Sequence, residues 1–448
     1  MSAVTYNDAL AFLLERTDWE RRSLGAPARG AWNLDRPRAL LAALCHPQQR
    51  YPSVHIAGTK GKGSTAAFLE SILRTAGLRT GLYTQPHLHD YRERVQINGE
   101  PIAQEALART VRHLAPVAEQ LEQETPDAGQ LTTYELGTAL AFQHFADAGV
   151  DWAVVEVGLG GRLDATNVLT PAVSAITALS LDHTALLGET LAAVAAEKAG
   201  IIKPCVPVVS TAQRPEPTET LTAIAAERDA PLTLGGRDFT WRGDHRAGMV
   251  IGDGWGYAGL ELGLVGHHQL ENAAVAVTVI EALRATAGLE VSTKAVRQGL
   301  LNVRWPGRLE VLQEGPDKPM VVCDGAHNGD SARRLAAAIR DWFPHHRLYL
   351  VVGSSADHDL AAIVAELRVL EPATVFAAAS IHPRARPAED VAAQARKAGG
   401  IAEAMPSVQA ATRHAAQQAA PGDLVLATGS LFVAAEARAA FGRTSVGD

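Results

Sequence analysis

The chain has 448 residues, of which 47% are hydrophobic and 20% charged, as in a globular protein large enough for two or three domains. Its net charge of −8 and its isoelectric point near 6.1 argue against a general nucleic-acid-binding or anionic-membrane surface. The three cysteines, Cys45, Cys205 and Cys323, form no C-x-x-C pair, which suits a reducing compartment and provides no framework for a metal.

The N-terminal 22 residues predict an amphipathic helix, because Asp8, Glu15, Asp18 and Glu20 interrupt a short apolar run. Such a segment is unlike a signal peptide. No apolar run in the sequence reaches the ~18–20 residues that a membrane-spanning helix requires. We therefore expect a cytoplasmic protein without membrane or nucleic-acid partners, and we expect it to act as a monomer.

Up to about residue 300, short apolar runs alternate with helical patterns, which predicts βαβ units around a parallel sheet. Gly77 is expected to end the first long helix. Between about 205 and 265 the alternation weakens and short strands with Gly-Asp turns appear, which predicts peripheral β structure. The predicted strands are 53–58, 80–85, 151–158 and 173–183, and the predicted helices are 64–77, 191–202 and 269–288.

The alternation resumes after a break near 301–305, with apolar runs such as MVVCDGAHN, RLYLVVGS, TVFAAAS and DLVLATGS, each followed by a helical pattern. This part of the chain predicts a second, smaller α/β domain. The predicted fold is therefore α/β, with a P-loop-type parallel-sheet ATPase domain over residues 1–303. A smaller Rossmann-like α/β domain is predicted over residues 304–448.

The segment GTKGKGS, residues 58–64, is similar to a phosphate-binding loop but departs from the common spelling G-x-x-x-x-G-K-[ST]. Gly63 follows Lys62, and Ser64 comes one position late. A strand that leads through glycines into a helix directs backbone N–H groups and the helix dipole toward an anion. Lys62 adds a mobile positive charge. The alternative is a plain glycine-rich turn; we interpret the segment as a phosphate site whose Ser64 caps the helix.

Glu156 ends the apolar run in WAVVEVGLGGRLDATN, as a carboxylate does at the end of a Walker-B strand. At the carboxyl end of a parallel strand it could hold Mg²⁺ beside the phosphates. The alternative is an acid that only caps a loop. The following GLGG has the wrong spacing for a dinucleotide-binding loop, and no helix follows it at once, so we reject that function.

Other polar residues at strand ends are weak signals when taken one at a time. His183 follows a predicted strand and, on spacing alone, is more often a structural histidine than a metal ligand. Lys198 lies in a helical pattern beside a glutamate, where a solvated charge is the ordinary interpretation, although lysine accounts for only seven of the 41 basic residues. In the second domain, Asp324 and His327 follow a strand, at the place where α/β domains bind ligands.

Taken together and in order, the motifs are specific. GT-x-GKGS, PHLHDYRERVQINGE, TTYELGTALAF, VEVGLGGRLDATN, LDHTALLGET, EKAGIIKP, HHQLENAA, PGR and DGAHN resemble the folylpolyglutamate synthase/dihydrofolate synthase family of the Mur ligase superfamily. The resemblance extends from about residue 30 to the C-terminus. It implies an ATP-dependent ligase in which a carboxylate of a folate or of dihydropteroate takes the γ-phosphoryl group of ATP. L-Glutamate then attacks the acyl phosphate through its amine, and ADP and phosphate are released.

The resemblance also assigns residues. It implies catalytic roles for Lys62, Lys198 and His183, with Lys198 carbamylated to N6-carboxylysine. Mg²⁺, as one or two ions, is expected at Glu156, His183, carbamylated Lys198 and, doubtfully, Gln85. The residues expected at ATP are Gly58, Thr59, Gly61, Lys62, Gly63, Ser64, Asn272, Arg308 and Asp324. Those expected at the folate or glutamate are Arg94, Leu131, Thr132, Thr133, Tyr134, Leu163, His327 and Ser430.

The sequence departs from the family pattern at several of these positions. Gln85 stands where a serine is usual, and its longer reach puts direct metal ligation in doubt. Tyr134 replaces a phenylalanine, Gly329 a proline and His358 a lysine. Lys60 replaces an asparagine and is either a second phosphate contact or a surface charge.

Two alternatives remain at this point. One is another amino-acid ligase of the Mur superfamily, such as a peptidoglycan-precursor ligase, although GLGGRLDATN favours the folate branch. The other is a P-loop switch or ATP-binding regulatory module, which the absence of an N-K-x-D motif and the presence of a whole second α/β domain disfavour. Within the folate branch, we predict that the protein accepts both dihydropteroate and tetrahydrofolate.

Overall fold

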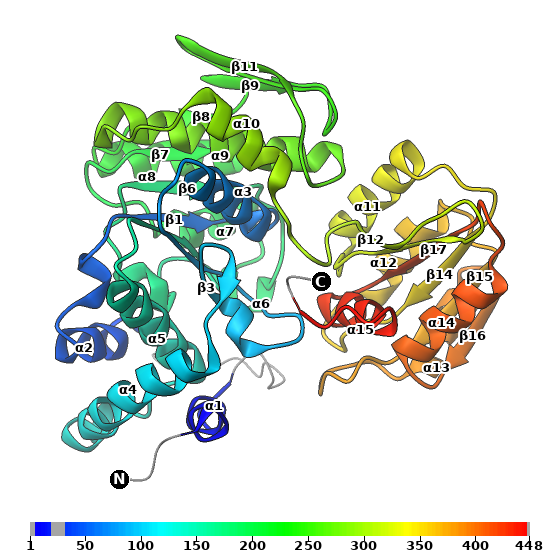
Figure 1. The fold of residues 1–448 in the computed structure, drawn as a ribbon, viewed down its shortest axis with the longest axis horizontal. Coiled ribbons are helices and arrows are strands. Elements are labelled where there is room, and N and C mark those ends of the chain that lie inside the picture. Colours follow the sequence, from blue (N-terminus) through cyan, green and yellow to red (C-terminus); the bar gives the residue numbers. More distant parts are fainter. Residues whose placement is uncertain (1–4, 19–31, 446–448) are drawn as a thin grey trace.

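An eight-stranded sheet forms the centre of the first domain in the computed structural model, which describes residues 5–18 and 32–445 (Figure 1). Its strand order is β4-β3-β2-β5-β1-β6-β7-β8. The six strands from β2 to β8 in this order pair in parallel, and β3 and β4 extend the sheet in antiparallel fashion. The bounds are β1 Ser53–Ala57, β2 Thr80–Tyr83, β3 Val95–Ile97, β4 Glu100–Pro101, β5 Trp152–Glu156, β6 Val173–Ile176, β7 Val208–Ser210 and β8 Leu232–Leu234.

Helices cover both faces of this sheet, because neighbouring strand residues point to opposite faces. Val154 packs in a core with helices α3 (Lys62–Thr75), α9 (His267–Ala287) and α10 (Thr293–Asn302). Its neighbours Ala153 and Val155 pack in a second core on the other face. That second core contains α1 (Tyr6–Leu14), α2 (Asp35–Ala43), α4 (Gln104–Glu124) and α5 (Thr133–Ala148). Helices α7 (Leu191–Ala199) and α8 (Pro215–Glu227) enclose a third, smaller core.

The region 205–265 differs in part from the prediction of peripheral β structure. Its first half continues the main α/β alternation through β7, α8 and β8. Its second half is peripheral, as predicted, and forms a separate three-stranded antiparallel sheet of β9 (Phe239–Arg242), β10 (Gly248–Gly252) and β11 (Trp255–Leu260). The first half was missed because β7 and β8 contain only three residues each, too few for a clear pattern.

The second domain has a six-stranded sheet with the order β12-β13-β17-β14-β15-β16, in which only the pairing of β12 with β13 is antiparallel. Helices α11, α12 and α13 cover one face, and α14 and α15 cover the other. The bounds are β12 Glu310–Gln313, β13 Met320–Cys323, α11 Gly329–Trp342, β14 Leu348–Val352, α12 Leu360–Arg368, β15 Thr374–Ala378, α13 Ala388–Lys397, β16 Ala402–Met405, α14 Val408–Gln418, β17 Leu424–Thr428 and α15 Leu431–Ala440. The predicted α/β class, with a parallel-sheet domain followed by a smaller α/β domain, is confirmed.

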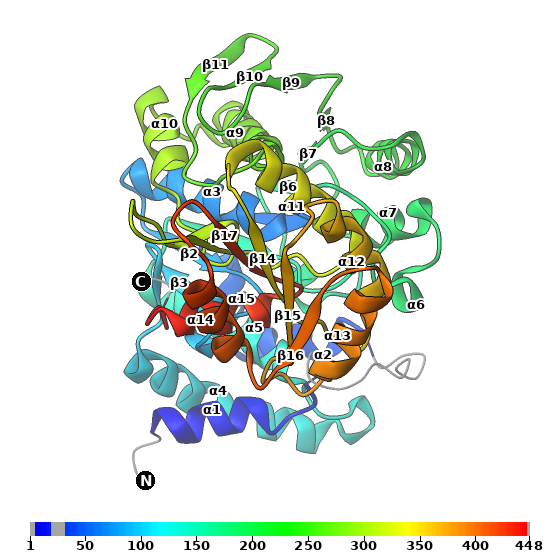
Figure 2. The same ribbon diagram turned by 90° about the vertical axis from the view of Figure 1, so that its right-hand side faces the viewer.

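The two domains lie beside one another and are joined by the segment 303–309, between α10 and β12 (Figures 1 and 2). The predicted boundary at residues 303 and 304 falls at the start of this connection. Away from the connection, Trp342 at the end of α11 packs against two imidazoles of the first domain, with ring centroids 4.5 Å from His245 and 5.5 Å from His267. Among the residues that the structure describes, no helix combines the length and the apolar composition needed to cross a membrane.

Candidate active site

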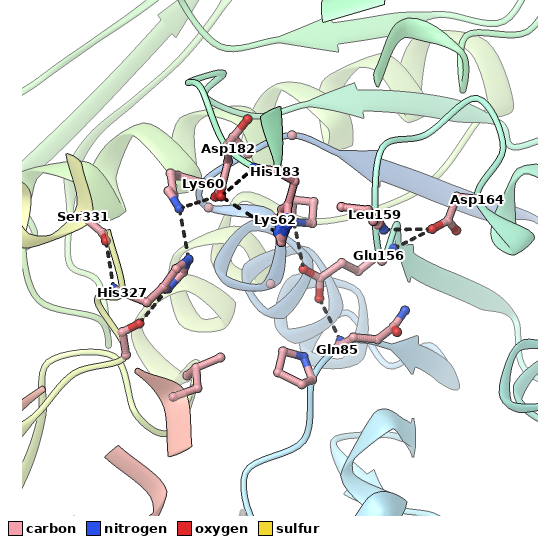
Figure 3. A pocket seen from close by; sticks show the side chains of 18 of the residues that line it. Lys60, Lys62, Gln85, Glu156, Leu159, Asp164, Asp182, His183, His327 and Ser331 are labelled. Carbon is pink, nitrogen blue, oxygen red and sulfur yellow. Dashed lines mark hydrogen bonds and ion pairs between the residues drawn. The ribbon is translucent and has the colours of Figure 1, made fainter. Parts of the chain in front are cut away.

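A cavity of about 460 Å³ lies between the two domains and is lined by both of them (Figure 3). From the first domain it receives the loop 58–64 after β1 and the segments that follow β5 and β6. From the second domain it receives the loop after β13 and the start of α15. Every site residue predicted from the sequence lines this cavity except Leu131, which is 1% exposed and packs in the core of the first domain.

The loop 58–64 has the geometry of an anion site. Helix α3 begins at Lys62, so the amides of its first turn, which have no partner within a helix, face the loop. Gly61 precedes the helix with φ of 90°, and a Cβ there would lie 2.1 Å from Asn272 Oδ1. The predicted cap was wrong: Ser64 lies inside the first turn, and Gly61 occupies the cap position without a side-chain hydrogen bond.

Lys62 and Glu156 face one another across the loop. Lys62 Nζ lies 3.8 Å from Glu156 Oε1, and Glu156 Oε2 accepts a hydrogen bond of 3.1 Å from the backbone N–H of Gln85 (Figure 3). Burial raises the pKa of the Glu156 carboxyl, and the charge of Lys62 opposes that rise. Glu156 is therefore a buried acid at the end of β5 whose compensating cation is the lysine of the loop.

The side chain of Gln85 is turned away from this pair. Its Nε2 donates a hydrogen bond of 2.9 Å to the hydroxyl of Tyr134, and its Oε1 is buried with no partner among the described residues. This oxygen is therefore buried, although Gln85 is among the residues that line the cavity. Direct metal ligation by Gln85, which the sequence placed in doubt, is not supported by this geometry.

His183 lies beside an acid that the sequence-based site did not include. Its side chain is 42% exposed, and its Nε2 lies 3.9 Å from Asp182 Oδ1. Asp182 also forms an ion pair of 2.8 Å with Lys60. Burial opposes ionisation of Asp182, but the charges of Lys60 and His183 outweigh it and hold the pKa well below its usual range. Asp182 lies in the segment after β6, directly before the predicted residue His183, and that adjacency was the signal that could have identified it.

Lys198 is not a solvated charge. It is 4% exposed near the end of α7 and lines the cavity. Burial, followed by the charge of Lys62, lowers the pKa of its ammonium to about 7. A substantial fraction of this side chain is therefore a neutral amine near neutral pH.

The donor set fits a divalent cation that takes most of its ligands from elsewhere. Within the described ranges 5–18 and 32–445, there is no group of three or more histidine, cysteine, aspartate or glutamate side chains that could hold a metal ion. Glu156 offers one buried carboxylate and His183 an accessible ring. Mg²⁺ commonly binds in this way, through one or two carboxylates together with phosphate oxygens and water.

The second domain and its junction contribute the other polar groups. Asp324 accepts hydrogen bonds of 2.9 and 2.8 Å from the backbone N–H groups of Leu309 and Ala326. Burial raises the pKa of Asp324, and the charge of Arg308 opposes that rise. His268, which the sequence analysis did not single out, also lines the cavity at the start of α9.

At the other end of the cavity, Tyr134 donates a hydrogen bond of 2.8 Å to Asp164 Oδ1. Asp164 Oδ2 accepts from the backbone N–H groups of Gly158 and Leu159, each at 3.0 Å. Asp164 was missed as a separate site residue although it lies in the motif GLGGRLDATN. Thr132 caps α5, so it orders the segment that carries Tyr134.

Arg94 and Thr133 are held by protein groups as well as lining the cavity. Arg94 Nε donates a hydrogen bond of 2.8 Å to His87 Nδ1, and its guanidinium lies 5.2 Å from the ring centroid of Tyr91. Thr133 Oγ1 donates to the carbonyl of Leu13 at 2.9 Å. Both residues therefore line the cavity with side chains that already have protein partners.

Two family models match the chain: the Mur ligase middle domain over residues 56–280 and the Mur ligase glutamate ligase domain over residues 307–431. A probable bifunctional folylpolyglutamate synthase/dihydropteroate synthase from Halobacterium salinarum is 42% identical over 420 residues. That match covers 90% of this chain and 49% of the relative, so the chain spans about half the length of that curated protein. The dihydrofolate synthase/folylpolyglutamate synthase of Bacillus subtilis is 35% identical over 373 residues, covering 80% of this chain and 83% of the relative.

Solved structures give the same result. FolC of Escherichia coli in complex with DHPP and ADP superposes with a TM-score of 0.86 at 30% identity and covers 99% of each chain. A bifunctional folylpolyglutamate synthase/dihydrofolate synthase with Mn, AMPPNP and L-glutamate bound superposes with a TM-score of 0.83 at 30% identity and covers 98% of each chain. These two proteins bind nucleotides, and one of them binds a divalent metal together with glutamate.

Proposed function

The chain belongs to the folylpolyglutamate synthase/dihydrofolate synthase family of Mur ligases, and from this premise we propose roles for its site residues. Members of this family are ATP-dependent ligases that join glutamate to folates and dihydropteroate. The observation that carries the proposal is the cavity lined by both domains. It brings a phosphate loop, a buried acid and a buried lysine from the first domain together with Arg308, Asp324 and His327 of the second.

The phosphate loop is proposed to hold the ATP phosphates. Lys62 and the first-turn amides of α3, which line the cavity, would supply the positive charge that β- and γ-phosphates need. Arg308 approaches from the second domain, where its Nη1 lies so close to Gly325 that a Cβ there would be 2.4 Å away. Asn272, packed against Gly61, fixes the loop to α9.

The chemistry proposed is two consecutive displacements. An oxygen of the substrate carboxylate attacks the γ-phosphorus of ATP, the bond from that phosphorus to the ADP oxygen breaks, and an acyl phosphate forms. The amine of glutamate then attacks the acyl carbon, the carbon–oxygen bond to phosphate breaks, and the amine nitrogen loses a proton. Catalysis of such transfers consists mainly of positioning and charge neutralisation.

Mg²⁺ is the proposed metal, and when bound beside Glu156 it neutralises charge on the transferred phosphoryl group. Glu156 is the proposed first protein ligand and His183 the second, an arrangement that also suits Mn²⁺. The enclosed position of Glu156, which is 4% exposed, keeps water from this charge. Exclusion of water also protects an acyl phosphate from hydrolysis.

Lys198 is the proposed site of carbamylation, which would create a ligand for a second ion. Carbamylation adds CO₂ to a neutral amine, which then loses a proton, and burial lowers the pKa of Lys198 to about 7. The product would be a carboxylate close to the charges of Lys60 and Lys62, which now disfavour the ammonium. The positive charges of Lys60 and Lys62 would therefore favour the carbamylated form of Lys198.

The acceptor end is proposed to lie around Tyr134, Asp164 and Leu163, where the cavity is bordered by α5 and the motif after β5. We propose both dihydropteroate and tetrahydrofolate as acceptors. We further propose a monomer, because a single chain supplies both walls of the cavity.

The test is phosphate release from ATP in the presence of glutamate, measured once with dihydropteroate and once with tetrahydrofolate. We expect release to depend on glutamate together with either acceptor. A basal ATPase activity that is indifferent to both would overturn the ligase function. Turnover of only one acceptor would overturn the dual specificity and leave the ligase function standing.

A further inference from the structure

Lys60 lies at the junction of the two domains, although it belongs to the phosphate loop. Its Nζ is 2.8 Å from Asp182 Oδ2 and 3.2 Å from His327 Nε2 (Figure 3). Asp182 follows β6 of the first domain, whereas His327 follows β13 of the second. The Lys60 side chain is only 13% exposed, so it is not a surface charge.

The direction of the contact with His327 is fixed by a neighbouring carbonyl. His327 Nδ1 lies 3.0 Å from the carbonyl oxygen of Gly325, and because a carbonyl can only accept, Nδ1 carries the hydrogen. In a neutral ring the other nitrogen, Nε2, is then an acceptor, which matches the donating ammonium of Lys60. Burial and the charge of Lys60 lower the pKa of His327 well below its usual range, in agreement with a neutral ring.

A second contact follows the same path between the domains. Asn328 Nδ2 donates to Asp182 Oδ2 over 3.4 Å. The orientation of this amide is set by its role as a helix cap, because Asn328 Oδ1 accepts from the backbone N–H of Ser331 at 3.0 Å. Asp182 Oδ2 therefore receives one donor from each domain.

We propose that Lys60 is a positioning residue that holds the second domain on the phosphate loop through His327 and, through Asp182, the cap of α11. This inference rests on the proposed function, since its consequence is that the glutamate side of the cavity keeps its place against the acyl phosphate. Two of the three N–H donors of the ammonium are already engaged, by Asp182 and His327. While this bridge is intact, one N–H donor of the ammonium is left for any other contact.

The direct test removes the donor and keeps the length of the side chain, with Lys60→Met. Spin labels on Cys45, which is exposed in the first domain, and on a Lys397→Cys variant in the second report the distance between the domains by pulsed electron paramagnetic resonance. A Cys205→Ser background removes the other exposed thiol. We expect Lys60→Met to broaden the distance distribution and to raise the KM for glutamate at least fivefold.

In the same variant, the affinity for a non-hydrolysable ATP analogue should change by less than twofold. The matched control is Lys294→Met, which removes an exposed lysine from α10 and should leave all three measurements unchanged. An unchanged distance distribution in Lys60→Met would overturn the proposal. A tenfold loss of analogue affinity with an unchanged distribution would show instead that Lys60 is a phosphate contact.

A second variant approaches the bridge from the other domain and keeps the test informative if Lys60→Met folds poorly. His327→Leu removes the acceptor and should broaden the distribution as Lys60→Met does. The distance distribution of the double variant should differ little from that of Lys60→Met, because both substitutions break the same contact between Lys60 and His327. Additive broadening of the distance distribution in the double variant would contradict the bridge. The distance measurement needs no turnover, so its outcome is separate from that of the ligase assay.

Discussion

Burial sets the charge of several side chains in the first domain. It lowers the pKa of His268 to about 4, and the charges of Arg334 and Arg308 act in the same direction. His268 therefore lines the cavity as a neutral ring. The same cause, with the charge of Lys203 added, lowers the pKa of His55 to about 3. His55 is fully buried in β1, where its Nε2 lies 2.8 Å from Thr166 Oγ1.

A neutral buried His55 predicts a specific acid sensitivity. Between its ordinary pKa of 6.5 and a folded pKa of about 3, the unfolded chain binds a proton that the folded chain does not. The free energy of unfolding should therefore fall by about 1.4 kcal/mol per pH unit as the pH drops through this window. His55→Gln should remove that part of the slope, as measured by urea unfolding from pH 7 to pH 4. Parallel slopes for both proteins would show that His55 is charged in the folded state.

Helix α3 shows how one element ties the phosphate loop to its surroundings. It begins after Gly61 and ends before Gly77, and both glycines have φ of 90°. A Cβ at Gly61 would meet Asn272 Oδ1 at 2.1 Å, whereas a Cβ at Gly77 would meet nothing within 4 Å. The two positions therefore share the same positive φ and differ in steric room.

This difference makes Gly77→Ala a matched control for Gly61→Ala. Both substitutions should lower the free energy of unfolding by about 1–2 kcal/mol, because a left-handed backbone conformation is costly for alanine. Gly61→Ala should lose more and should also weaken binding of a non-hydrolysable ATP analogue at least tenfold, since Asn272 must move. Urea unfolding and titration calorimetry measure the two effects. Equal losses in both variants would mean that the contact with Asn272 is not tight.

The elements with strong patterns could be predicted from the sequence, and those set by distant contacts could not. Runs 151–158 and 269–288 correspond to β5 and α9, because their apolar residues are continuous or periodic. The start of α3 was placed two residues late, since the left-handed conformation of Gly61 leaves no mark on composition.

The site shows the same division. Lys62, Glu156 and Asp324 were predicted because each lies at a strand end or in a glycine-rich loop. The bridge formed by Lys60 was not, because its partners are 122 and 267 positions away in the chain. Gln85 could be doubted from its length, but only the hydrogen bond to Tyr134 shows where its amide points.

At the scale of the whole molecule, two domains with separate hydrophobic cores share one cavity. The cavity is lined by residues of both domains, and the segment 303–309 is the covalent connection between them. A ligand bound there stabilises whichever domains it contacts, by an amount that depends on its concentration relative to its Kd.

A non-hydrolysable ATP analogue at a hundredfold excess over its Kd should therefore stabilise the folded state by about 2.7 kcal/mol. Both domains should unfold together at a higher temperature in differential scanning calorimetry, because the proposed ATP site takes residues from each of them. Lys62→Met should lose most of this shift, measured against the Tm of the same variant without ligand. Stabilisation of one domain alone would show that the nucleotide does not reach across the cavity.

The packing of Trp342 between the domains has an optical consequence. Its indole lies edge-on to His245, close to His267, and the guanidinium of Arg246 is 5.3 Å from the ring centroid. Any separation of the domains would replace these neighbours with water. The emission of Trp342 should then shift in wavelength and intensity. Its intrinsic fluorescence should therefore report domain motion in real time during turnover.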